Sequence, residues 1–275
     1  MKKIPLPSLQ MAFIGGGNMA QAIIAGLIRS GYPANAIQVV EPVAAQRSLL
    51  ESKWGLNCRA FPSEELSRTD MLVWAVKPQS FAQAATDVAR LTQQAVHISV
   101  MAGISTDTLA NRLQTERIIR AMPNTPAMIG QGISGLFARH SVSIAERRQA
   151  EWLLSCTGEV LWFDQEDALD AVTAISGSGP AYVFFMMEAL VEAAQNLGLS
   201  AQQGLALALA TFKGATALAL DSTEPPQDLR QKVTSKGGTT HAAISHLESQ
   251  GVRETFIQAV IAARDRARQM GKELC

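Results

Sequence analysis

The chain has 275 residues, a length that suits two domains better than one. Hydrophobic residues make up 47% and aromatic residues only 5%, so Ala and Leu supply much of the core and helices are favoured over an all-β architecture. The 24 basic and 24 acidic residues give a net charge of zero, which leaves no basic face for phosphates and argues against a nucleic-acid partner.

The first segment, Met1 to Gln10, contains two lysines and two prolines but no apolar signal core, so export is not expected. The three cysteines, Cys58, Cys156 and Cys275, lie far apart and match neither a disulfide framework nor a zinc motif. An odd number of widely spaced cysteines suits a reducing compartment. We therefore expect a cytoplasmic protein without a metal site.

Short apolar runs alternate with helical patterns in the first half of the chain. The predicted strands are Met11–Ile14, Ile37–Val40, Met71–Val76, Val96–Val100 and Arg117–Ala121. An amphipathic helix, Met19–Arg29, follows the first strand directly. Strands interleaved with helices are joined by right-handed crossovers, which predicts an α/β fold with a Rossmann-like parallel sheet.

The first strand leads into Gly15-Gly16-Gly17-Asn18-Met19-Ala20, a G-x-G-x-x-A motif that opens the helix. In such a motif Gly15 permits the tight turn, Gly17 lets the backbone approach a pyrophosphate, and Ala20 lets helix and strand pack closely. The free N–H groups of the helix then point at the phosphates. A glycine-rich turn alone is weak support, but the strand–turn–helix context predicts a dinucleotide site.

The second strand ends at Glu41, 26 residues after Gly15. An acidic side chain there suits the ribose diol of NAD and repels a 2′-phosphate, although a solvated Glu at a strand end is an equal alternative. Arg47, six residues on, can instead reach a 2′-phosphate. The choice between NAD and NADP stays open.

Three later segments follow predicted strands and therefore lie at the ligand edge of the sheet. Lys77 closes the third strand, and Ala102 stands among small residues that leave room for a nicotinamide ring. Asn124, between two prolines in A-M-P-N-T-P, can bind a carboxamide. A surface lysine and an ordinary turn asparagine are the simpler interpretations of Lys77 and Asn124.

The strand pattern ends near Asp164, where helical patterns take over. The predicted helices are Ala181–Leu197, Ala201–Leu220, Thr239–Gln250 and Arg253–Glu273. We expect a Rossmann domain over residues 1–164 and an all-α domain over residues 165–275. The apolar run Gly204–Leu220 has one charge, Lys213, and is shorter than the roughly 20 residues of a membrane span, so we expect it to be buried between subunits.

Two glycine-rich loops precede helices in this region. Ser176-Gly177-Ser178-Gly179-Pro180-Ala181-Tyr182 places Pro180 in a first helical turn. Val233-Thr234-Ser235-Lys236-Gly237-Gly238-Thr239-Thr240 ends at another helix start, where exposed N–H groups from Gly237 to Thr240 can bind a carboxylate without any Arg. Neither loop alone indicates a reaction.

Five segments in this order resemble pyrroline-5-carboxylate reductase: G-G-G-N-M-A, A-V-K-P, A-M-P-N-T-P, S-G-S-G-P-A-Y and S-K-G-G-T-T. The resemblance runs from about Met11 to the last predicted helix. It implies reduction of 1-pyrroline-5-carboxylate to L-proline with NADPH or NADH, the last step of proline synthesis. It also implies a C-terminal dimerisation domain, and hence a homodimer or a ring of dimers.

The resemblance also implies site residues, matched position by position. On the cofactor it places Gly16, Asn18, Met19, Glu41, Val43, Val76, Lys77 and Ala102. On the substrate it places Glu166, Lys232, Gly238, Thr239 and Thr240.

The sequence departs from the family pattern in two places. Lys236 stands where the family usually has Pro, which can loosen the carboxylate loop. Near Pro62-Ser63 the family often has an Asn against the adenosine phosphate, and neither residue replaces it well.

Reduction of a C=N bond needs a hydride at carbon and a proton at nitrogen. A protonated cyclic imine already accepts hydride readily, so the protein mainly orients the reactants, an effect of about 7–11 kcal/mol. We expect the Thr240 hydroxyl to hydrogen-bond the ring nitrogen and hold or relay its proton. The alternative is that Thr240 is only a helix N-cap.

Two other kinds of protein share parts of this pattern. β-Hydroxyacid dehydrogenases use a Lys on the long helix with an Asn a turn later, but the helix from Tyr182 to Leu197 has no Lys, and Lys213 is followed by G-A-T-A. A non-catalytic NAD(P)-binding protein would keep the same loops. Turnover of NADH or NADPH with pyrroline-5-carboxylate distinguishes these alternatives.

Overall fold

A computed structural model describes residues 8–274 of the chain. Most of the N-terminal segment that was checked for an export signal, residues 1–7, and one of the three cysteines, Cys275, lie outside the described residues. The chain forms two compact units. The first comprises residues 8–178 with 263–274, and the second comprises residues 179–262.

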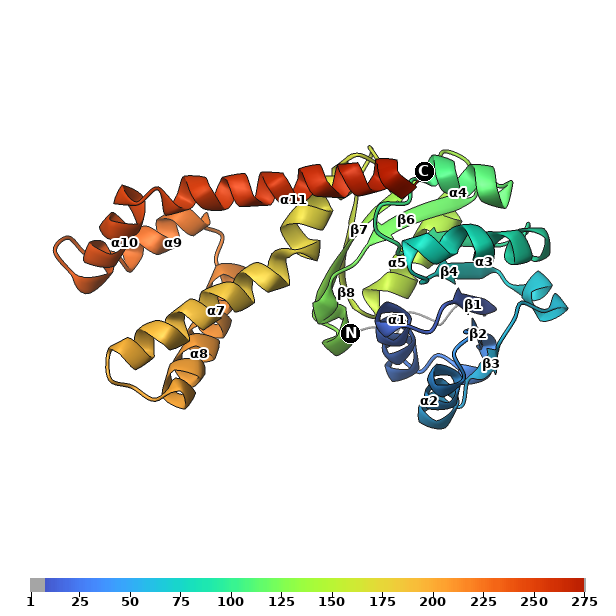
Figure 1. Cartoon of the computed structure of the whole chain (residues 1–275), viewed down its shortest axis with the longest axis horizontal. Coiled ribbons are helices and arrows are strands. Elements are labelled where there is room, and N and C mark those ends of the chain that lie inside the picture. The colour runs from blue at the N-terminus through green and yellow to red at the C-terminus, as the bar shows by residue number, and fades with distance from the viewer. Residues whose placement is uncertain (1–7, 275) are drawn as a thin grey trace. The chain divides into compact units, whose positions relative to one another are not determined.

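The first unit is built on a sheet with the strand order β3-β2-β1-β4-β5-β6-β7-β8 (Figure 1). Its strands are β1 Met11–Ile14, β2 Ile37–Val40, β3 Asn57–Arg59, β4 Met71–Trp74, β5 Val96–Ser99, β6 Ile118–Met122, β7 Gly132–Ala138 and β8 Gly158–Trp162. Strands β1 to β6 are parallel, which confirms the predicted Rossmann-like sheet. Strands β2 and β3 are added on one side of β1, and β4 and the later strands on the other side. The strand order therefore switches between β1 and β4, which is where such sheets bind ligands.

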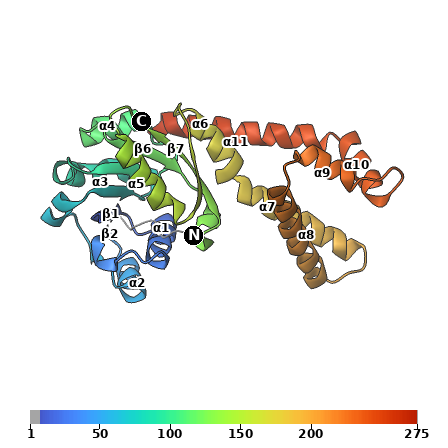
Figure 2. The ribbon, with the colours of Figure 1, turned by 180° about the vertical axis from the view of Figure 1, so that it is seen from behind.

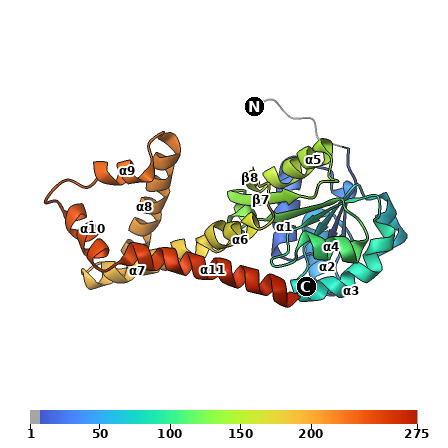
Figure 3. The ribbon, with the colours of Figure 1, turned by 90° about the horizontal axis from the view of Figure 1, so that it is seen from above.

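Helices cover both faces of this sheet. They are α1 Asn18–Arg29, α2 Ala44–Trp54, α3 Phe81–Val88, α4 Thr106–Leu113, α5 Ile144–Ser155, α6 Ala168–Val172 and a π segment Thr173–Gly177. Short 3-10 turns span Ala34–Ala36, Glu64–Arg68, Pro78–Ser80, Ala89–Leu91 and Thr125–Ile129. Met11 and Phe13 of β1 pack with α1 and α5, whereas Ala12 and Ile14 pack with α3 and α4 on the other face. Figure 3 shows these helices around the sheet. The two faces follow from the two-residue period of a strand.

The sequence predicted five of these strands but not β3, β7 or β8. β3 is short, and β8 alternates between half-buried and exposed residues, so neither has the apolar run that identified the others. β7 contains two glycines and runs antiparallel to β6, with β8 parallel to it. The connection from β6 to β7, residues 123–131, is too short for a parallel crossover.

The second unit is helical, as predicted. Its helices are α7 Gly179–Asn196, α8 Ala201–Asp221, α9 Pro226–Lys232, α10 Thr239–Ser249 and the first part of α11 Val252–Leu274. α7 and α8 lie side by side (Figure 2). A Cβ on Gly204 would lie 2.8 Å from the Cβ of Ala194, so glycine permits this close packing. A capping box formed by Ser200 and Gln203 begins α8.

The expected division after residue 164 differs from the division that the structure has. α6 packs with β6 and β7, the π segment packs with α6, and both belong to the first unit. Residues 263–274 of α11 also pack with the first unit, although the sequence grouped them with the helical region.

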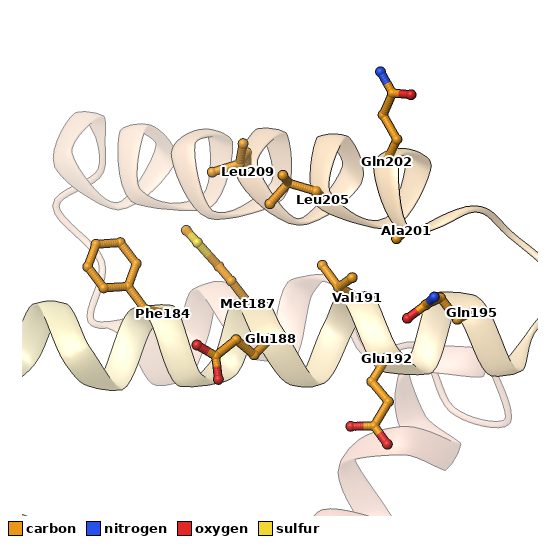
Figure 4. A pocket seen from close by; sticks show the side chains of 10 residues that line it. All are labelled: Phe184, Met187, Glu188, Val191, Glu192, Gln195, Ala201, Gln202, Leu205 and Leu209. Atoms are coloured by element: carbon orange, nitrogen blue, oxygen red, sulfur yellow. The ribbon is translucent and has the colours of Figure 1, made fainter.

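α7 and α8 carry apolar side chains that the chain itself leaves uncovered. Phe184, Met187 and Val191 of α7 face Leu205 and Leu209 of α8 across a groove (Figure 4). Segments Ala168–Asn196 and Ala201–Asp221 are long and apolar enough to cross a membrane, judged by length and composition alone. In the most apolar 18-residue stretch of each segment, only 6% and 11% of the residues are buried. The length argument against a membrane span is therefore wrong, because α8 has 21 residues.

Candidate active site

The glycine-rich turn lies at the carboxyl end of β1, beside the point where the strand order reverses. Gly15 has a φ of +96°, and its N–H donates to the Val40 carbonyl over 2.8 Å. A Cβ on Gly15 would lie 2.7 Å from the carbonyl oxygen of Ala75. Both the backbone angle and the approach of the segment after β4 therefore require glycine here.

The N-terminus of α1 opens onto unfilled space at this turn. Gly17 is the N-cap, and among the described residues no atom apart from its chain neighbours and the adjoining helix backbone lies within 4 Å of the position that its Cβ would take. Gln21 N donates to Gly17 O over 2.9 Å, so the N–H groups of Asn18 and Met19 precede this helical bond. These N–H groups and the positive end of the helix can hold a pyrophosphate, as the motif predicted.

Glu41 is buried at the end of β2 with its carboxylate between two backbone N–H groups. Oε2 accepts from Gly16 N over 2.8 Å, and Oε1 accepts from Val43 N over 2.9 Å. Each oxygen keeps a further lone pair for a ribose hydroxyl. Arg47 Nη1 donates to the carbonyls of Glu41 and Pro42, both over 2.8 Å, so this guanidinium braces the β2–α2 turn.

Val76, Lys77 and Ala102 follow β4 and β5 at the same edge of the sheet. Lys77 is exposed, and Ala102 is half-buried beside Gly103, whose φ is +78°. Near the other end of this edge, Ser63 Oγ is buried without a hydrogen-bond partner in the described structure. The residues predicted for the cofactor in the first unit therefore follow the carboxyl ends of neighbouring strands, where a dinucleotide fits.

The side chain of Asn124 is used inside the fold. Its Nδ2 donates to Ser176 O over 3.2 Å, and its Oδ1 accepts from Ile133 N over 3.0 Å. Asn124 thus ties the loop after β6 to β7 and to the π segment. A contact with a cofactor carboxamide stays a prediction.

Glu166 belongs to a charged cluster that sequence reasoning missed. Its Oε1 accepts from Thr106 N and from Arg120 Nη1, each over 2.8 Å, and its Oε2 accepts from Thr106 Oγ1. Arg120 also lies 3.7 Å from Asp170, and burial raises the pKa of the Asp170 carboxyl although Arg120 and Arg268 oppose this shift. A charged residue in the middle of the apolar run from Ile118 to Met122 is the sequence signal that would have found Arg120.

The predicted carboxylate loop lies in the second unit and leads into α10. Gly237 has a φ of +76°, and Gly238 is the N-cap of α10 without any side-chain cap bond. The interpretation of Thr240 as the N-cap is therefore wrong. Ala242 N donates to Gly238 O over 3.1 Å, which leaves the N–H groups of Thr239 and Thr240 ahead of this bond.

Lys232 and both threonines are exposed in the second unit. Lys232 Nζ lies 2.6 Å from each carboxylate oxygen of Glu224, so its charge is paired within the unit. Glu166 lies in the first unit. The structure therefore places the predicted substrate residues in two groups: Glu166, and the loop from Lys232 to Thr240.

Three ionisable groups elsewhere, the buried His97 and the half-buried Cys58 and Cys156, are poor nucleophiles or bases. Burial lowers the pKa of His97 to about 4 and raises the pKa of the Cys58 thiol to about 11 and of the Cys156 thiol to about 12. Cys58 and Cys156 are both free. Over residues 8–274, no group of three His, Cys, Asp or Glu side chains is placed to hold a metal ion.

Two segments of the chain match models of known protein families. Residues 10–103 match the family model described as NADP oxidoreductase coenzyme F420-dependent, and residues 166–270 match the model described as pyrroline-5-carboxylate reductase dimerisation. A pyrroline-5-carboxylate reductase of Pseudomonas aeruginosa is 40% identical, with 96% of this chain and 98% of that protein covered.

The chain is also similar to solved structures of pyrroline-5-carboxylate reductases. A pyrroline-5-carboxylate reductase from Coxiella burnetii is 37% identical with a TM-score of 0.90, covering 96% of this chain and 99% of that chain. A pyrroline carboxylate reductase from Plasmodium falciparum, solved with NADP bound, is 27% identical with a TM-score of 0.85, covering 96% and 98% of the two chains.

Proposed function

The chain belongs to the pyrroline-5-carboxylate reductase family, and we propose how its residues reduce 1-pyrroline-5-carboxylate to L-proline, the final step of proline biosynthesis, with NADPH or NADH. The observation that carries the proposal is the combination, in one chain, of an open glycine-rich turn after β1 and an uncapped helix N-terminus at Gly238. The first suits a dinucleotide, and the second suits a carboxylate.

The cofactor is held by the first unit. The N–H groups that follow Gly16 and Gly17 bind the pyrophosphate, and the Glu41 carboxylate binds the adenosine ribose. Val76, Lys77 and Ala102 lie along the rest of the cofactor. NADPH or NADH, when bound, supplies the hydride.

The substrate is held by the loop before α10. The Gly238 N–H donates to the Ser235 carbonyl over 3.0 Å, so the N–H groups of Thr239 and Thr240, at the positive end of the helix, bind the substrate carboxylate. The Thr240 hydroxyl meets the ring nitrogen and holds its proton as that nitrogen changes from imine to amine. Glu166 and Lys232 complete the substrate residues that the family resemblance implies.

This arrangement needs no strong acid or base from the protein. A protonated imine is already an electrophile, so binding the substrate carboxylate and the cofactor in a fixed orientation supplies most of the rate enhancement, about 7–11 kcal/mol for well-oriented reactants. The absence of a His or Cys with a pKa near 7 among the buried groups named above fits this scheme.

The test is a direct assay on the purified chain. Pyrroline-5-carboxylate should be consumed with an equal amount of NADH or NADPH, and L-proline should form. Oxidation of the cofactor without proline would contradict the proposal. Oxidation of a β-hydroxyacid by NAD(P), or cofactor binding without turnover, would instead support one of the two alternatives.

The same proposal includes a homodimer, assembled further into a ring of dimers, in the cytoplasm. The dimer is supported by the apolar groove between α7 and α8, where Phe184, Leu205 and Leu209 are 59%, 46% and 48% exposed. Contact with a second copy of the chain would remove these apolar side chains from water, which is favourable. The cytoplasm is supported by the free thiols of Cys58 and Cys156.

A further inference from the structure

The loop from β5 to α4, residues 100–105, follows the strand end that is proposed to lie along the nicotinamide half of the cofactor. It contains Ala102 and Gly103 and ends at Ser105, the N-cap of α4. Ser105 accepts from Thr108 N over 3.1 Å. The conformation of this loop therefore decides where Ala102 lies.

One side of the loop is held by a carboxylate from a distant part of the chain. Glu166 accepts the N–H of Thr106, the first residue of α4, and also meets its hydroxyl. Thr106 is 1% exposed, so these bonds are shielded from water. A carboxylate on the first N–H of a helix is favoured both by the hydrogen bonds and by the helix dipole.

Arg120 sets the orientation of that carboxylate. Its side chain is only 8% exposed and donates to Glu166 over 2.8 Å. Asp170 lies 3.7 Å from the same guanidinium and 3.6 Å from Arg268 of α11. Buried charges that are paired in this way keep a single geometry, because breaking one pair leaves another charge unpaired.

The other side of the loop is held by the last turns of α11. A Cβ on Gly271 would lie 3.3 Å from the carbonyl oxygen of Gly103. Glycine thus lets the helix backbone pack directly against the loop. A cavity of about 330 Å³ remains beside it, lined in part by Gly103, Ser105, Arg120 and Glu166.

We propose that Glu166, oriented by Arg120, and Gly271 clamp the β5–α4 loop from two sides and so position Ala102 against the nicotinamide ring of the cofactor. Arg120, Thr106 and Gly271 are positioning residues in this arrangement. The inference rests on the proposed function, because it takes Ala102 to lie along the cofactor.

The test compares two kinds of ligand, with and without a nicotinamide ring, on a matched pair of variants. Thr106→Val removes the hydroxyl that meets Glu166 while it keeps the shape of the side chain, and Thr106→Ser keeps the hydroxyl. NADH and NADPH carry a nicotinamide ring, whereas ADP-ribose and its 2′-phosphate lack that ring but keep the adenosine, both phosphates and both riboses. Dissociation constants of all four ligands can be measured by calorimetry.

Thr106→Val should bind NADH and NADPH about threefold to tenfold more weakly and bind both ADP-ribose ligands as the parent does. Thr106→Ser should match the parent for all four ligands. Equal losses for dinucleotide and ADP-ribose, or no loss for either, would overturn the clamp, since a general loss of structure does not act on the nicotinamide ring alone.

A second variant covers the case in which Thr106→Val does not fold. Gly271→Ala places a methyl group against the Gly103 carbonyl and should weaken dinucleotide binding alone, by about twofold to fivefold. Its melting temperature should not fall, because alanine favours a helix more than glycine does. Parent affinity for the dinucleotide in this variant would also overturn the clamp. None of these measurements needs pyrroline-5-carboxylate, so a parent protein that binds cofactor but lacks reductase activity would sink the proposed function and leave the clamp intact.

Discussion

Oε2 of the Glu41 carboxylate lies 2.8 Å from the backbone nitrogen of Gly16 and accepts its N–H, which joins the end of β2 to the glycine-rich turn after β1. The other oxygen accepts from Val43 N over 2.9 Å. The same carboxylate therefore shapes the turn that is proposed to hold the pyrophosphate and presents charge to the proposed ribose site.

Replacing this carboxylate should change cofactor preference. Glu41→Ser removes the charge that would repel a 2′-phosphate, so the ratio of kcat/KM for NADPH to that for NADH should rise about tenfold, chiefly through cofactor affinity. Glu41→Gln, which keeps one oxygen acceptor, should show a smaller rise and a higher melting temperature than Glu41→Ser. An unchanged ratio in both variants would show that Glu41 only shapes the turn.

Substitutions of Gly15 and Gly17, the first and third glycines of the turn, should have different effects. Gly17→Val should fold, because its Cβ would meet no described atom within 4 Å beyond the adjoining backbone, yet lose cofactor binding, because the branched side chain fills the pyrophosphate space. Gly15→Ala should unfold more easily, since a φ of +96° alone costs about 1–3 kcal/mol and the Cβ would also press on Ala75. Melting curves with and without NADPH separate the two outcomes, and a Gly17→Val protein with parent affinity would rule out this placement of the dinucleotide.

The Thr240 hydroxyl should matter for turnover rather than for stability. Thr240→Ala should lower kcat/KM about tenfold to a hundredfold, the equivalent of losing a hydrogen bond to a charged group, about 1.5–3 kcal/mol. Because Gly238 rather than Thr240 caps α10, the melting temperature should stay close to that of the parent. Thr240→Ser serves as the control and should retain most of the activity. A Thr240→Ala protein that reduces pyrroline-5-carboxylate at the parent rate would remove Thr240 from the mechanism.

Acid should destabilise the first unit through His97. Its ring accepts from Trp74 Nε1 over 3.0 Å and contacts Thr92 O over 3.1 Å, and burial lowers its pKa from 6.5 to about 4. Between these two values the unfolded chain binds a proton that the folded chain does not, so the free energy of unfolding should fall by up to about 1.4 kcal/mol per pH unit as the pH drops from 6.5 towards 4.

Urea unfolding at pH 7 and pH 5 checks this expectation. His97→Gln should be less stable at pH 7 but should lose less stability on acidification than the parent. His140→Gln, at an exposed position, is the matched control and should keep the parent's dependence on pH. If His97→Gln and the parent lose the same free energy of unfolding between pH 7 and pH 5, groups other than His97 cause the loss.

The apolar groove of the second unit should be a dimer contact. In sedimentation experiments the parent should be a dimer or a larger assembly, and Leu209→Glu should shift it towards monomer, because a carboxylate at an apolar contact is costly to desolvate. Leu49→Glu on α2, where the leucine is 45% exposed, is the control and should leave the assembly unchanged. A stable, active parent monomer would contradict the proposed dimer.

Local sequence pattern was sufficient for much of the first unit. β1 and β2 coincide with the predicted Met11–Ile14 and Ile37–Val40, and α1 begins one residue before its predicted start. Strand and helix periods repeat within a few residues, and the G-x-G-x-x-A motif carries its own backbone requirements at Gly15 and Gly17. For that reason residues close together in sequence were sufficient to predict a dinucleotide site at this turn.

The partners of individual side chains were decided only by the tertiary structure. Glu166 and Arg120 are 46 residues apart in the chain and meet because β6 and the segment before α6 pack together, a contact that no local period encodes. Asn124 looked free to bind a ligand, but the fold brings Ser176 and Ile133 to its amide group. Gly271 likewise meets Gly103 only because the end of α11 packs with the first unit. Sequence by itself determined β1, β2, α1 and the glycine-rich turn, since these depend on near neighbours, whereas long-range packing decided which polar groups are satisfied within the fold and which remain open to a ligand.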